Sequence, residues 1–109
     1  MSALLRGRFD ATAKARSVAE LQSAISEMEQ LMSALNRFVA REEERTRVSD
    51  LTHYTYSPAA MAARERVLKL NQSITDLIAK LEIAIVDRDQ ALAVVAALDA
   101  TASLFHRKR

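Results

Sequence analysis

The sequence has no cysteine and no tryptophan, and only one glycine and one proline among its 109 residues. Without cysteine, no disulfide framework, thiolate metal site or cysteine nucleophile can form. Because glycine and proline mark most tight turns, their scarcity predicts very few turns. No run of about eighteen apolar residues occurs, and the N-terminal segment lacks the apolar stretch of a signal peptide. We therefore expect a cytoplasmic chain without membrane insertion.

What the sequence does contain is helix-forming residues in a heptad pattern. Half of the residues are apolar, but twenty are alanine, which predicts one domain with a thin core. Apolar residues recur at alternating steps of three and four along two segments, as in the core of a coiled coil. The first series is Val18, Leu21, Ile25, Met28, Met32, Leu35 and Val39. The second is Val67, Leu70, Ile74, Leu77, Leu81, Ala84, Arg88, Ala91, Val95, Leu98, Ala102 and Phe105.

Between the two series lies the stretch SDLTHYTYSP, residues 49–58, which holds both tyrosines and the only proline. Ser57 followed by Pro58 is a typical helix start, with serine as N-cap and proline at the first helical position. We predict an all-α fold, an antiparallel two-helix coiled-coil hairpin, forming a single domain over residues 1–109. Helix 1 is expected at about 8–47, the turn at about 48–57 and helix 2 at about 58–106.

The predicted register pairs residues whose numbers add to 105 or 106, such as Leu35 with Leu70, although a slip of one heptad is left open. The centre of the turn then falls between Thr52 and His53, and the hairpin tip is formed by Asp50, His53, Tyr54 and Tyr56. We expect these tip residues to order the turn or to contact a partner, without a catalytic role.

Charge is unevenly distributed, although the net charge is only +2. The segments 1–16 and 103–109 carry +6, and the other residues carry −4. A hairpin would bring these two segments together as a basic partner-binding end. Its members are Arg6, Arg8, Lys14, Arg16, Arg107, Lys108 and Arg109. The acidic body, and the lack of a basic stripe with interleaved aromatics, argue against nucleic-acid binding.

Stripes of apolar residues spaced by seven also flank the two heptad series. Ile78, Ile85 and Leu92 flank the second series, and Ala24, Leu31 and Phe38 flank the first. One interpretation is a broad core edge covered by long charged side chains. The other is a docking surface for a partner helix or for a second copy, which would make a homo-oligomer.

The sequence offers no candidate catalytic or metal-binding residues. His53 and His106 would lie at opposite ends of the hairpin, so they cannot share a metal ion. The carboxylates of Glu42, Glu43 and Glu44 form a charged run that is typical of a solvated helix end. We expect no catalytic residue, no metal and no cofactor.

Residues 41–84 carry a pattern that is more specific than the heptads. The turn contributes Asp50, His53 and Tyr56 to this pattern. The helix after the turn contributes Ala62, Ala63, Arg66, Asn71, Ser73, Leu77, Leu81 and Ala84. In these residues the segment resembles the central part of the FliJ-type flagellar export proteins of alphaproteobacteria. In the turn of that family, a proline follows the aspartate and a second proline directly follows the tyrosine. Here Leu51 replaces the first proline, and Ser57 separates Tyr56 from Pro58.

The resemblance implies a two-helix coiled coil in the cytoplasmic part of the flagellar type III export apparatus. Proteins of that family act as a stalk in the hexameric export ATPase, contact the export-gate membrane protein and recycle export chaperones. An alternative from the residues alone is a general coiled-coil adaptor, or a self-associating bundle, with no ATPase partner. The two hypotheses differ in whether the basic end or the apolar flank binds the partner.

Overall fold

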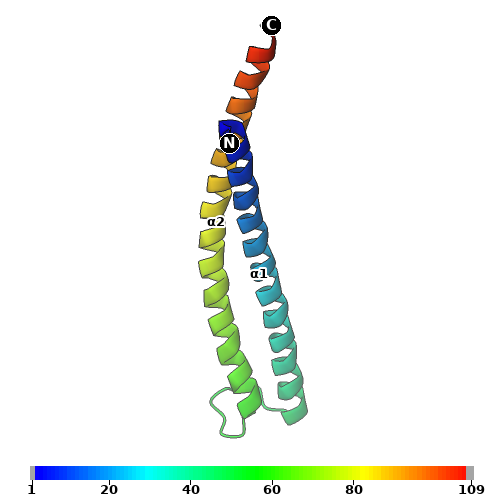
Figure 1. The fold of residues 1–109 in the computed structure, drawn as a ribbon. Coiled ribbons are helices and arrows are strands. Elements are labelled where there is room, and N and C mark those ends of the chain that lie inside the picture. The colour runs from blue at the N-terminus through cyan, green and yellow to red at the C-terminus, as the bar shows by residue number, and fades with distance from the viewer. Residues whose placement is uncertain (1, 108–109) are drawn as a thin grey trace. The chain divides into compact units, whose positions relative to one another are not determined.

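The computed structural model describes residues 2–107, with the backbone alone for His106 and Arg107. Two helices, α1 (Ala3–Thr46) and α2 (Pro58–Arg107), are joined by a loop of residues 47–57 (Figure 1). The described residues contain no strand. The predicted all-α hairpin of two helices packed against each other is therefore confirmed. Lys108 and Arg109 of the predicted basic end lie outside the described residues.

The helix boundaries follow from local capping. Ser2 accepts a hydrogen bond at Oγ from the backbone N–H of Leu5 (3.1 Å), so α1 begins five residues before the predicted start. At its other end, Arg47 has a φ of 59°, the left-handed conformation that commonly ends a helix. Ser57 accepts from the N–H of Ala60 (3.2 Å), as predicted for the N-cap of α2.

The chain divides into two compact units, which we name by their content. The tip unit is Ala24–Leu77 and contains the loop. The terminal unit is Met1–Ser23 together with Ile78–Arg109, and it contains both ends of the chain. Each unit includes a part of α1 and a part of α2, so each is an antiparallel helix pair.

In the tip unit, the predicted heptad positions form the core. Ile25, Val39 and Ile74 are buried, and the other predicted members are half-buried. Next to the loop, Val39 packs in a cluster with Tyr56, Ala60 and Ala63. The half-buried residues packed against this cluster are Leu35, Phe38, Val48 and Met61. Phe38 therefore belongs to the tip core and not to an open flank.

In the terminal unit, the same periodicity is filled by smaller residues. Its buried members are Ala11, Val18 and Ala91. Gly7 lies in the helix contact, since a Cβ built on it would be 3.4 Å from Val95 Cγ2 and 3.6 Å from Leu98 Cδ1. Gly7 and Leu98 obey the predicted register, so a slip of one heptad does not occur in this unit.

One predicted member of the core is wrong. Phe105 is 77% exposed, whereas its heptad position predicted burial. The register places the position that would face Phe105 before Ala3, where α1 begins. No residue of α1 is therefore available to cover the ring.

Candidate functional site

The loop is held by two side chains, each of which is hydrogen-bonded to the residue two positions further along the chain. Asp50 Oδ1 accepts from the backbone N–H of Thr52 (2.9 Å) and from its hydroxyl (2.7 Å). These bonds lower the pKa of Asp50, the Thr52 hydroxyl being the larger cause. His53 Nδ1 accepts from the N–H of Thr55 (3.1 Å), with the Thr55 hydroxyl at 2.6 Å. Asp50 and His53 thus order the turn, as predicted.

Tyr56 links the loop to both helices. The ring is buried in the tip core, and its hydroxyl donates to Glu43 Oε2 on α1 (3.2 Å). The same hydroxyl accepts from Arg64 Nε on α2 (2.8 Å), and Arg64 Nη2 donates to Glu43 Oε2 (3.0 Å). The bonds to Tyr56 and then to Glu43 raise the pKa of Arg64. This closed triangle fixes the loop against both helix ends.

A second link joins the end of α1 to the start of α2. Ser57 Oγ donates to Glu42 Oε2 (2.9 Å), and Arg45 donates to both oxygens of Glu42 (3.2 and 2.7 Å). The bonds from Arg45, and secondly from Ser57, lower the pKa of the Glu42 carboxyl. The predicted solvated acidic run is therefore wrong for Glu42 and Glu43, which are half-buried, while Glu44 is exposed.

These links to the loop were missed because a run of charges along one helix does not show which distant residues it faces. The sequence offered one signal. Arg64 stands seven residues after the N-cap, and the predicted register places it close to Glu43. An ion pair across the hairpin could have been inferred from that placement.

Tyr54 behaves differently from Tyr56. It is 93% exposed, and its ring stacks on that of His53, with the ring centres 4.9 Å apart. Tyr54 is therefore an outward-facing aromatic of the loop. On the same unit, a hollow of about 270 Å³ is lined by the side chains Asn36, Leu51, Met61, Arg64, Glu65, Val67 and Leu68.

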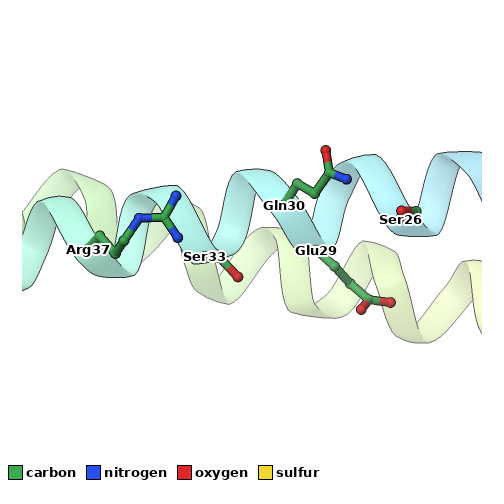
Figure 2. Close-up of a pocket in the computed structure, with 5 residues that line it drawn as sticks. All are labelled: Ser26, Glu29, Gln30, Ser33 and Arg37. Carbon is green, nitrogen blue, oxygen red and sulfur yellow. The ribbon is translucent and has the colours of Figure 1, made fainter.

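A larger hollow of about 430 Å³ lies along the part of α1 in the tip unit. Its lining is Ser26, Glu29, Gln30, Ser33 and Arg37. Figure 2 shows these five side chains spread along the helix and not converging on one point. All five are exposed, and they recur at helical spacing, which is typical of the polar face of an amphipathic helix. This arrangement does not form a ligand site.

The basic end predicted from the sequence is only partly described. Arg6 and Arg16 are exposed on α1, and Lys14 is half-buried at a heptad position. Arg8 lies 3.6 Å from Asp99 across the helix pair, with both side chains 58% exposed. Such an exposed ion pair contributes little to stability. The side chain of Arg107 lies outside the described part, like Lys108 and Arg109.

The predicted flank stripe is uneven. Ile78 and Leu92 are 42% and 50% exposed, but Ile85 between them is half-buried. Further large apolar side chains of the terminal unit are exposed as well. They are Leu5, Phe9, Ile83, Val86, Val94, Leu104 and Phe105. Apolar surface in this unit thus extends well beyond the predicted stripe.

Neither a metal site nor a membrane span is seen. Among the described residues, no group of three or more histidine, cysteine, aspartate or glutamate side chains could hold a metal ion. None of the helices in the described range is long and apolar enough to cross a membrane.

Comparison with known proteins adds no relative to this description. No family model, no curated protein and no solved structure matches the chain.

Proposed function

We propose that this protein is a non-catalytic coiled-coil component of the flagellar type III export apparatus, like the FliJ-type proteins that residues 41–84 resemble. The supporting observation is the role of the residues that carry the resemblance. Asp50, His53 and Tyr56 are among the side chains whose hydrogen bonds hold the loop. Heptad leucines occur in any coiled coil, whereas these three residues specify a particular turn.

In this proposal the terminal unit acts as a stalk in the hexameric export ATPase. Arg6 and Arg16 are exposed on α1, and they would face acidic side chains in the mouth of the ring. A stalk needs no catalytic group, because unequal contacts with the ring conformations are enough to change their populations. Contact with the export-gate membrane protein and recycling of export chaperones would place the protein in the cytoplasm at the inner membrane.

The test is ATP turnover by the purified cognate export ATPase. The variant Arg6→Glu with Arg16→Glu is expected to abolish stimulation, and stimulation by the wild-type protein should fall with added salt. The matched control is Arg66→Glu with Lys69→Glu, which reverses two exposed charges on the tip unit. Circular dichroism checks that both variants remain helical. Full stimulation by the variant changed at 6 and 16 would contradict the stalk role.

A second candidate is a general coiled-coil adaptor or a self-associating helical bundle. The observation that favours it is the exposed apolar surface of the terminal unit, since exposed apolar patches mark interaction sites. The two candidates predict different sensitive positions. An adaptor would lose partner binding on Ile78→Glu or Leu92→Glu and would tolerate reversal of Arg6 and Arg16.

A further inference from the structure

The helix α2 carries a second heptad series on the side opposite to α1. Its positions lie two residues after those of the inner series, a rotation of roughly 200° about the helix axis. We call this series the outer face. Its members are Ala79, Ile83, Val86, Gln90, Ala93, Ala97, Ala100 and Leu104. None is charged and all eight are exposed.

The outer face lies wholly within the terminal unit, where α1 already covers the inner series. Ile83, Val86 and Leu104 are 65%, 53% and 59% exposed, although large apolar side chains at heptad spacing usually pack against another helix. A helix that is apolar on both sides is normally buried inside a larger bundle. The outer face is therefore suited to bind one more helix.

The order of side-chain sizes along the outer face indicates which helix fits. Large residues occupy positions 83, 86 and 104, and alanines occupy positions 79, 97 and 100. An antiparallel copy of α2, centred between Gln90 and Ala93, would join one alanine with one larger side chain in every layer. The layers are Ala79 with Leu104, Ile83 with Ala100, Val86 with Ala97, and Ala93 with Gln90.

This alternation of large and small residues keeps the two helices at a constant distance and lets their layers interdigitate. A parallel copy would set Ile83 against Ile83 and Ala97 against Ala97. The helices would then be held apart at positions 83, 86 and 104 and would leave voids at positions 97 and 100. Size complementarity therefore favours the antiparallel pair, which is also closed by a two-fold axis.

The charges beside the outer face agree with this orientation. Its edges carry Lys80, Glu82, Asp87 and Asp89. In the antiparallel pair these carboxylates would face residues 94–101 of the other copy, where the only charged residue is Asp99. Asp99 pairs with Arg8 of α1 (3.6 Å), away from the outer face. In a parallel pair, Asp87 of each copy would instead face Glu82 of the other copy, which is repulsive.

A hollow of about 270 Å³ lies within the outer face, lined by Glu82, Ile83, Val86 and Asp87. The alanines at 97 and 100 of an antiparallel copy would come to this hollow. Their short side chains would allow close approach of the helix backbone. We propose that two copies of this chain associate through the outer faces of α2, antiparallel and related by a two-fold axis. This association does not depend on the proposed role in flagellar export.

Sedimentation equilibrium of the full chain over a wide concentration range tests the association. We expect the wild-type protein to show a monomer–dimer equilibrium. Ala97→Glu should raise the dissociation constant at least tenfold, because it places a carboxylate opposite Val86. Glutamate is a good helix former, so α2 stays folded. Ala62→Glu, at an exposed alanine of α2 in the tip unit, is the matched control and leaves the constant unchanged.

Two results would overturn the proposal. One is a wild-type protein that stays monomeric at all concentrations, and the other is equal dimerisation of the Ala97→Glu and Ala62→Glu variants. Orientation is tested by disulfide cross-linking, since the natural chain has no cysteine. Chains with Val86→Cys mixed with chains with Ala97→Cys are expected to form the mixed dimer preferentially. Predominant cross-linking of Val86→Cys chains to each other would contradict the antiparallel arrangement.

Discussion

The tip unit and the terminal unit are nearly equal in length, but they bury their apolar side chains to different extents. Among the described residues, the tip unit has four exposed large hydrophobic side chains and the terminal unit has nine. Near the loop, the tip unit also buries Tyr56 and ties it to both helices. The helix contact of the terminal unit relies on small residues such as Gly7, Ala11 and Ala91.

This difference indicates that the two units have different roles. The tip unit buries Tyr56 and ties it to both helices, so more of its apolar and polar groups find partners within the unit. The terminal unit leaves apolar surface in contact with water, which costs free energy unless another helix covers it. We infer that the tip unit stabilises the hairpin and the terminal unit binds.

The largest expected effect is at Tyr56. Replacing Tyr56 by alanine removes a buried ring and leaves Glu43 and Arg64 without their shared hydroxyl. By analogy with other aromatic-to-alanine changes in cores, it should destabilise the protein by about 3 to 5 kcal/mol. Tyr54→Ala is the control and should be nearly neutral, because Tyr54 is 93% exposed. Urea unfolding measures both, and equal effects would show that the tip core is not centred on Tyr56.

A smaller effect of opposite sign is expected in the terminal unit. A methyl group at Gly7 would meet Val95 and Leu98 at ordinary contact distances of 3.4 and 3.6 Å. Gly7→Ala should therefore fill the thin helix contact and favour the helix, stabilising the protein by roughly 0.5 to 1 kcal/mol. The measurement is the same urea titration. A clear loss of stability would mean that the helices are closer at this point than described.

The smallest effect concerns acid. Because the pKa of Glu42 is lowered in the folded protein, its hydrogen bonds stabilise the fold fully at pH values above the ordinary pKa of 4.5. That contribution is lost as the pH falls below 4.5 through the lowered pKa. Glu42→Gln should therefore show a weaker loss of stability with falling pH than the wild-type protein. The control is Glu44→Gln, two residues further along α1 at an exposed position, and thermal melts from pH 7 to pH 3 compare the wild-type protein with the two variants.

The sequence was sufficient to predict the helices and their pairing. Heptad spacing places each predicted member at a buried or half-buried position except Phe105, since periodicity alone does not show where the partner helix begins. The start of α1 was missed because the predicted heptad series begins at Val18 and does not locate the helix start, whereas Ser2 provides the cap. The links of Glu42 and Glu43 to the loop depend on residues 13 to 21 positions away, and no local pattern reveals them.

The candidate site was predicted less completely than the fold. Asp50, His53 and Tyr56 were correctly placed in the loop, because turn-forming side chains act on their near neighbours. The basic end and the flank stripe stay predictions, because binding surfaces are defined by partners that the sequence does not contain. The outer face of α2 was not predicted, because half of its members are alanines, which are also ordinary helix formers.

The most direct test of these different roles is hydrogen exchange of backbone amides, followed at low and at high protein concentration. At low concentration the helical amides of the tip unit should exchange at least tenfold more slowly than those of the terminal unit. Local opening of the terminal unit exposes less additional apolar surface, so it costs less free energy. At high concentration, residues 79–104 should gain protection and the tip unit should not. Equal protection of the two units at low concentration, or protection that rises uniformly with concentration, would contradict the account.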